Sequence, residues 1–303
     1  MQFPILSVLI FLPILAGIVL LLLPAGRKNL IKWIALVTAS LILLLSVIVY
    51  FSYDIAAGGY QFIERANWVP ALGISYYVGI DGIGAPMVLL AGLVMFTGVM
   101  VSWGVDDRPR EFFSFMMFLG ASVLGVFCAL DLFMLFFFFE LAVFPKYLMI
   151  VLWGSPKTRN YGGMKLTLYL FIGSMIALVG ALAIYFGSGL RTFDMIALEG
   201  AGFSTAFQRL WFPFVFLGFG ILSGIFPFYS WAPDGHVAAP TAISKGRASP
   251  QGSKSAPSPA CVPARCCRSR SSPNGSMAWT TRNRAATRSR CTSTRCAGSL
   301  APS

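Results

Sequence analysis

The chain contains seven long apolar stretches, and these limit its possible folds more than any other feature. The first runs from residue 3 to residue 24 without one charged side chain. A helix needs about 20 mostly apolar residues to cross the hydrocarbon core of a bilayer. The other stretches cover 33–53, 83–104, 112–130, 132–152, 163–187 and 211–229. The sequence therefore predicts an all-α polytopic membrane protein with six full transmembrane helices and a broken seventh.

The composition excludes an ordinary soluble domain. Hydrophobic residues make up 57% of the 303 residues and charged residues only 11%, whereas about a quarter of a soluble domain is charged. A transmembrane barrel would show segments of about ten residues with alternating hydrophobicity, and the long apolar runs do not have that pattern. The first stretch could be a signal peptide, but no basic segment precedes it and no small-residue cleavage site follows it.

The short loops between the stretches predict an orientation. Three positive residues lie in the even-numbered loops, namely Arg65, Arg191 and Arg209. Seven lie in the odd-numbered loops, namely Arg27, Lys28, Lys32, Arg108, Arg110, Lys157 and Arg159. Loops rich in Lys and Arg tend to remain in the cytoplasm. We therefore expect a multi-pass protein of the cell inner (plasma) membrane whose N-terminus lies outside the cytoplasm.

The last 59 residues differ from the rest of the chain. Residues 245–303 contain 11 Lys and Arg but no acid, whereas residues 1–244 contain 12 Lys and Arg and 11 acids. The tail has no apolar period, and its five cysteines match no zinc spacing. We interpret residues 1–244 as an incomplete transmembrane domain and residues 245–303 as a basic disordered tail read in a shifted frame. The alternative is a genuine tail that binds acidic lipid or nucleic acid.

Glu140 is the charged residue deepest in an apolar stretch. It is the ninth residue of the stretch 132–152 and follows four phenylalanines, so a helix would place it about 12 Å below its start. Ionisable residues inside transmembrane helices are rare and usually belong to ion or proton pathways. We predict a role for Glu140 in proton translocation. The alternative is a structural carboxylate that is paired across a helix interface.

Two lysines are further candidates for proton translocation. Lys146 directly follows Pro145 and lies six residues after Glu140. On a regular helix Lys146 would point about 120° away from Glu140, with about 9 Å of rise between them. Lys165 is the third residue of the stretch 163–187. Either lysine could instead extend its ammonium group to the membrane surface.

The segment 226–241 is expected to break the seventh helix. The residues expected at the break are Pro227, Pro233, Asp234, Gly235 and Pro240. Proline removes a backbone donor, and irregular backbone at membrane depth persists only inside protein or beside a water-filled cavity. The segment also holds His236, the only histidine, whose side chain can exchange protons near neutral pH. We predict a relay role for His236; a hydrogen-bonded core residue is the alternative.

Three motifs carry a resemblance to a known family. The run 135–145, with Glu140 inside it, resembles the glutamate-bearing fifth helix of chain M of NADH–quinone oxidoreductase, respiratory complex I. The run 231–236, followed by 239–241, is similar to the break in that family's seventh helix, and 79–83 to the start of its third helix. Chains L and N and cation/proton antiporter subunits share the fold. The resemblance covers residues 1–244, about the N-terminal half of a family member.

The resemblance implies an antiporter-like helix bundle, here truncated. It implies a membrane subunit that couples electron transfer from NADH to quinone to proton translocation. Such a subunit has no redox centre of its own, so no cofactor or metal is expected on this chain. The implied partners are the other membrane subunits of complex I, protons and the lipid bilayer, and no nucleic acid. The family's glutamate corresponds to Glu140 and its helix-six lysine to Lys165.

One position departs from the family pattern. Members usually carry a lysine nine residues before the tryptophan that corresponds to Trp231, and this chain has Leu222 there. The departure places the family's Glu–Lys pair in doubt, and Lys146 is the cation we expect to replace it. Two other functions remain as alternatives: a subunit of a cation/proton antiporter, or a nonfunctional fragment.

Overall fold

The computed structural model describes residues 4–24 and 26–239, and its elements are mostly helices. The first part comprises α1 (Ile5–Leu22), α2 (Lys28–Ser52), β1 (Gln61–Val69), η1 (Pro70–Leu72) and β2 (Ile74–Ile80). The middle comprises α3 (Gly84–Val101), η2 (Ser102–Gly104), α4 (Pro109–Cys128) and α5 (Leu132–Trp153). The last part comprises α6 (Arg159–Gly187), α7 (Met195–Glu199), α8 (Thr205–Ser223), η3 (Phe228–Ser230) and α9 (Trp231–Ala238).

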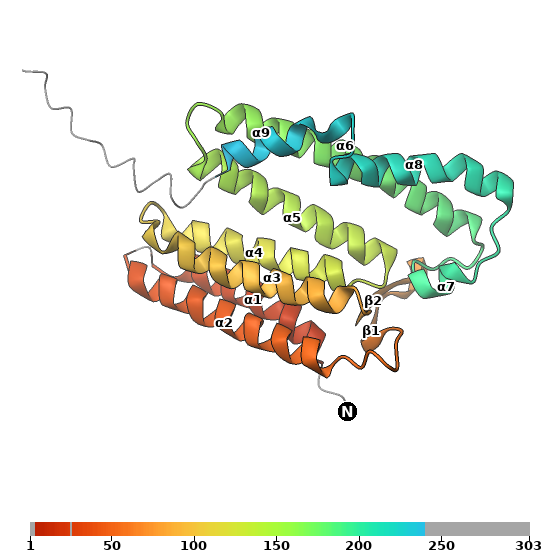
Figure 1. Ribbon diagram of the computed structural model, residues 1–303, viewed down its shortest axis with the longest axis horizontal. Helices are drawn as coiled ribbons and strands as arrows, with labels where there is room; N and C mark the ends of the chain where they lie inside the picture. The colour runs from red at the N-terminus through yellow and green to blue at the C-terminus, as the bar shows by residue number, and fades with distance from the viewer. Residues whose placement is uncertain (1–3, 25, 240–303) are drawn as a thin grey trace, which may run out of the picture. The chain divides into compact units, whose positions relative to one another are not determined.

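Helix α5 lies between the group formed by α1 to α4 and the group formed by α6, α8 and α9 (Figure 1). Helices α1 to α4 lie side by side, α5 packs against α4, and α6 packs against α5 and carries α8 and α9. Small residues allow close approach, as is usual between membrane helices. A Cβ on Gly218 of α8 would lie 2.6 Å from the Cβ of Ala177 on α6, and one on Gly125 of α4 would lie 2.5 Å from the Phe138 ring on α5.

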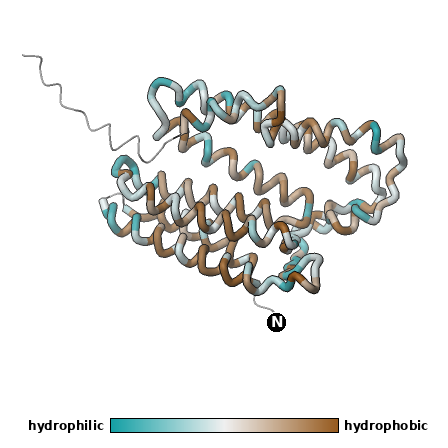
Figure 2. Tube along the Cα trace, viewed as in Figure 1, coloured by the Kyte–Doolittle hydropathy of each residue, from teal (hydrophilic) through white to brown (hydrophobic). Residues whose placement is uncertain are grey.

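The predicted membrane spans are confirmed. Seven helical segments of the described chain are long and apolar enough to cross a membrane, and the last of them contains the break between α8 and α9. Apolar residues run along the helices while polar residues gather at their ends (Figure 2). The observed bounds differ from the expected ones by a few residues; α6, for example, begins at Arg159 rather than at residue 163. The predicted tail, 245–303, lies outside the described residues.

The hairpin of β1 and β2 was not predicted, because the segment between Tyr53 and Ile83 mixes polar and apolar residues and was treated only as a loop between membrane spans. Its strands pair antiparallel, with Gln61 opposite Ile80. Gly73 makes the turn possible: its φ is +68°, and a Cβ there would lie 2.0 Å from the Arg191 carbonyl oxygen. That position therefore requires glycine.

The hairpin is fastened to the start of α1 by Glu64. The Glu64 carboxylate accepts hydrogen bonds from the Leu6 amide at 2.9 Å, from the Ser7 amide at 3.0 Å and from the Ser7 hydroxyl. A carboxylate at this position satisfies free N–H groups of the first helical turn and lies at the positive end of the helix dipole. The Ser7 hydroxyl also lies 3.0 Å from the Tyr76 hydroxyl. Burial and the nearby Glu64 charge raise the pKa of Tyr76 to about 12, so its hydroxyl stays protonated at neutral pH.

Replacing Glu64 with Ala should lower the thermal stability of the protein. The change removes the acceptor for three donors at the start of α1, and loss of a helix cap costs about 1–2 kcal/mol. A melting curve in detergent should show a fall of several degrees in Tm. Glu199 is exposed at the end of α7 and provides the control: Glu199→Ala should leave the Tm unchanged. Equal melting temperatures for the Glu64→Ala variant and the wild type would contradict the capping role.

Candidate functional site

Helix α5 positions Glu140 in the membrane. The helix starts at Asp131, whose carboxylate accepts hydrogen bonds from the amides of Phe133 at 2.9 Å and Met134 at 3.2 Å. From this cap α5 continues as one helix through Pro145 to Trp153. Glu140 is its ninth residue, which corresponds to about 12 Å from the helix start. The depth predicted from the sequence therefore holds in the structure.

One carboxylate oxygen of Glu140, Oε1, is buried and has no hydrogen-bond partner among the described residues. An ionised carboxylate oxygen that is buried without a donor is costly. The described residues therefore provide no donor for this oxygen. The alternative of a structural carboxylate paired across a helix interface receives no support within the described chain.

Lys146 lies in the same helix without a partner. Its side chain is half-buried, and in the part of the chain that the structure describes it forms no hydrogen bond or ion pair. Because α5 is continuous through Pro145, Lys146 remains six residues, or roughly 9 Å of rise, from Glu140. The structure thus provides an unpaired amine on the helix that carries the unpaired carboxylate.

Lys165 has a partner that the sequence did not predict. Its Nζ lies 2.7 Å from Oδ2 of Asp234, and the exposed fractions of the two side chains are 18% and 43%. The Lys165 amine also lies 5.7 Å from the centre of the Tyr161 ring. Asp234 was expected only as a residue of the helix break. Lysine and acid are 69 positions apart in the chain, and no sequence signal connects them.

The helix break lies earlier than expected. Helix α8 ends at Ser223 and is capped by Gly224, whose φ is +74°, and the chain then passes through Pro227 and η3 before α9 begins. Pro233, Asp234 and Gly235, predicted at the break, lie inside α9 instead. Pro233 fits there because it occupies the first helical turn, where an N–H needs no partner within the helix. Pro240 lies outside the described residues.

His236 is placed on the outside of α9. It is exposed, and its side chain forms no hydrogen bond or ion pair with another described residue. The described structure therefore brings Lys165 and Asp234 together but leaves Glu140, Lys146 and His236 each without a polar partner. The relay role of His236 remains a prediction.

The position that carries a lysine in the family pattern lies beside an apolar cavity. Leu222, at the end of α8, lines a cavity of about 420 Å³ together with Phe139, the residue before Glu140. Ser223 and Ile225 line it as well. A longer side chain at Leu222 would therefore extend into space that adjoins α5.

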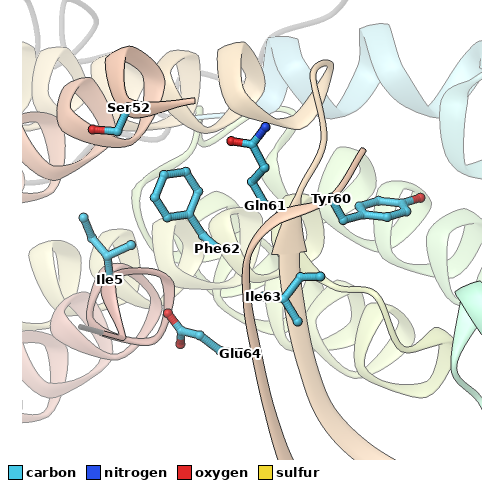
Figure 3. Close-up of a pocket in the computed structure, with 7 residues that line it drawn as sticks. All are labelled: Ile5, Ser52, Tyr60, Gln61, Phe62, Ile63 and Glu64. Carbon is cyan, nitrogen blue, oxygen red and sulfur yellow. The ribbon is translucent and has the colours of Figure 1, made fainter. Parts of the chain in front are cut away.

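The largest of the described cavities lies elsewhere. About 720 Å³ opens between the start of α1, the end of α2 and β1, and Figure 3 shows Ile5 and Glu64 next to each other at its side. None of the residues that line it belongs to α5, α6 or α9. Because Glu64 already accepts three hydrogen bonds from α1, we assign this region to the attachment of the hairpin.

Comparison with known proteins identifies the fold that carries these residues. Residues 129–245, which include Glu140, Lys165 and Asp234, match the transmembrane family of NADH:quinone oxidoreductases and Mrp antiporters. This segment of the chain is therefore similar to that family. The match covers α5, α6, α8 and α9, so the site described above lies within the family region.

Individual relatives agree with the family assignment. The chain is 37% identical over 244 residues to NAD(P)H-quinone oxidoreductase chain 4-2 of Synechocystis sp., covering 80% of this chain and 44% of the relative. It is 36% identical to chain 4 of Gloeobacter violaceus, covering 78% and 45%. A chain of respiratory complex I from Thermus thermophilus matches with a TM-score of 0.68 at 28% identity, covering 76% and 46%.

The resemblance found in the sequence and the antiporter-like membrane fold are both confirmed. The chain is a multi-pass membrane protein whose residues 129–245 match this family, and its relatives are subunits of larger membrane complexes. The chain spans somewhat less than half the length of the curated relatives it matches.

Proposed function

We propose that the chain is a proton-translocating membrane subunit of an NADH–quinone oxidoreductase. In this function, electron transfer from NADH to quinone takes place on other subunits and drives proton movement through this one. The observation that carries the proposal is the unpartnered carboxylate oxygen of Glu140 in the middle of α5, inside the family segment. A carboxyl group that lacks a fixed partner in the membrane can take up and release a proton.

The proposed proton path uses four side chains. Glu140 is the carrier within the membrane, and Lys146 is the unpaired amine on the same helix that exchanges charge with it. Lys165 and His236, on α6 and α9, continue the path toward the break after α8. The chain holds no redox centre in this proposal, so the NADH and quinone sites belong to its partner subunits.

The proposed setting is the cell inner membrane with the N-terminus outside the cytoplasm. The first, third and fifth loops, which carry most of the positive charge, then face the cytoplasm.

Affinity purification of the tagged chain from its native membrane, followed by identification of the bound subunits, tests the proposed role in an NADH–quinone oxidoreductase. Co-purifying quinone-site and iron–sulfur subunits are expected. Recovery with antiporter subunits alone would instead indicate a cation/proton antiporter.

The frame interpretation of residues 245–303 gives a separate prediction. The family match ends at residue 245, where the acid-free basic segment begins. Shifting the reading frame near codon 245 should reveal an apolar stretch of about 20 residues, enough for the next membrane helix. Sequencing the DNA around this codon is the measurement. Alternative frames that are polar or interrupted by stop codons would show that the basic segment is genuine.

A further inference from the structure

Helix α9 is attached to its neighbours at several points. The Lys165–Asp234 ion pair joins it to α6. The Trp231 indole donates a hydrogen bond to the Ile221 carbonyl of α8 at 2.9 Å. At the other end of α9, the Ala238 carbonyl accepts from the Ser155 amide at 3.2 Å. The short helix is therefore held across its full length.

Close packing fixes the distance between α9 and α6. A Cβ on Gly235 would lie 2.4 Å from Cδ1 of Leu166, the residue after Lys165. A Cβ on Gly162 would lie 2.6 Å from the Cβ of Ala238. Both glycines allow a backbone approach that any side chain would prevent. Asp234 thus reaches Lys165 only while α9 is seated on α6.

The acid lies on α9, after the helix break, whereas its lysine lies on the neighbouring helix α6. Gly224 lies at the break with a φ of +74°, a left-handed backbone conformation that favours glycine. The break thus separates α9 from the rest of the seventh span, and Asp234 lies on the segment after it. A change in the backbone at the break would move the acid relative to Lys165.

Lys165 is only partly exposed, with 18% of its side chain accessible. It lies six residues after the first residue of α6, or about 9 Å along the helix. A lysine ammonium at membrane depth is costly without hydration or a counter-charge. Among the described residues, Asp234 is the acid that pairs with it, and the Tyr161 ring is its other polar neighbour.

We propose that Asp234 is a positioning residue for Lys165 and makes the charge of this lysine depend on the docking of α9. When α9 is seated, the carboxylate stabilises the protonated amine; when α9 moves away, the amine loses its counter-charge and releases its proton more readily. This role rests on the proposed function. It deepens that function, because it links proton release to the geometry of the break.

The test compares variants of the chain within the purified complex. Asp234→Asn keeps the side-chain size but removes the charge, and Asp234→Glu keeps the charge. The double variant Lys165→Gln with Asp234→Asn keeps a hydrogen bond between α9 and α6 without any charge. Glu199→Gln, at the exposed end of α7, is the control. The readouts are the amount of assembled chain and the number of protons moved per NADH oxidised.

We expect Asp234→Asn to lower the proton ratio severalfold, Asp234→Glu to retain most of it and Glu199→Gln to leave it unchanged. The double variant should assemble like the wild type and pump as poorly as Asp234→Asn. A double variant that pumps at the wild-type ratio, or that fails to assemble, would show that the Lys165–Asp234 pair only stabilises the structure. Either result would overturn the positioning role of Asp234. Asp234→Asn at the wild-type ratio would overturn it as well. A wild-type complex that moves no protons would instead contradict the proposed function itself, independently of any variant.

Discussion

Replacing Glu140 with Gln should abolish proton translocation while the complex still assembles. Gln keeps the size of the side chain and its capacity for hydrogen bonds, but it cannot bind and release a proton. Loss of an ionisable group from a proton-transfer step typically costs on the order of 10²–10⁴-fold, so the pumped protons should fall below detection. The measurement is the NADH-driven pH change in vesicles that contain the reconstituted complex.

Two controls separate a relay role from a structural one. Glu140→Asp keeps an ionisable carboxyl group and should retain part of the pumping. The amount of chain in the membrane reports on folding, and it should be the same for Gln, Asp and wild type because one Glu140 oxygen makes no hydrogen bond within the described residues. Pumping by the Gln variant at the wild-type level would refute the relay role.

Replacing Lys146 with Met should strongly impair pumping, and a lysine at position 222 should restore it. Lys146 is unpaired among the described residues and shares α5 with Glu140. Leu222 occupies the position of the family's lysine and lines the apolar cavity beside Phe139. A lysine in place of Leu222 would bring an amine to the same region from α8. The double variant Lys146→Met with Leu222→Lys should therefore pump better than Lys146→Met alone.

The control for this exchange is a lysine with no expected role in the pathway. Lys157 is exposed in the loop between α5 and α6, and Lys157→Met should leave pumping unchanged. A Lys146→Met variant with full activity would show that Lys146 only extends toward the membrane surface. A double variant no better than Lys146→Met would show that the two positions do not substitute for each other.

The membrane spans and the depth of Glu140 could be predicted because both depend on local sequence. Twenty apolar residues identify a span regardless of what packs against it. The position of Glu140 within α5 follows from counting along one helix. The positive φ of Gly224 was not predicted, because the expected break was placed at the prolines that follow it in the chain. Pro233 fits into the first turn of α9, where proline is tolerated.

The ion pair and the hairpin could not be predicted because they depend on contacts between distant residues. Lys165 and Asp234 are 69 positions apart and meet only because α9 folds back onto α6. Gln61–Val69 contains both charged and apolar residues, and its pairing with β2 depends on the turn at Gly73 and on the attachment of Glu64 to α1. Neither the ion pair nor the hairpin produces a recognisable hydrophobic pattern in the local sequence.

The most direct test of the proposed function is to purify the complex through a tag on this chain and reconstitute it in sealed vesicles. NADH and a quinone are then added while the internal pH is recorded. We predict NADH-dependent proton movement that stops when electron transfer to the quinone is inhibited. Proton movement driven by a gradient of monovalent cations, with no response to NADH, would contradict the account and identify an antiporter subunit.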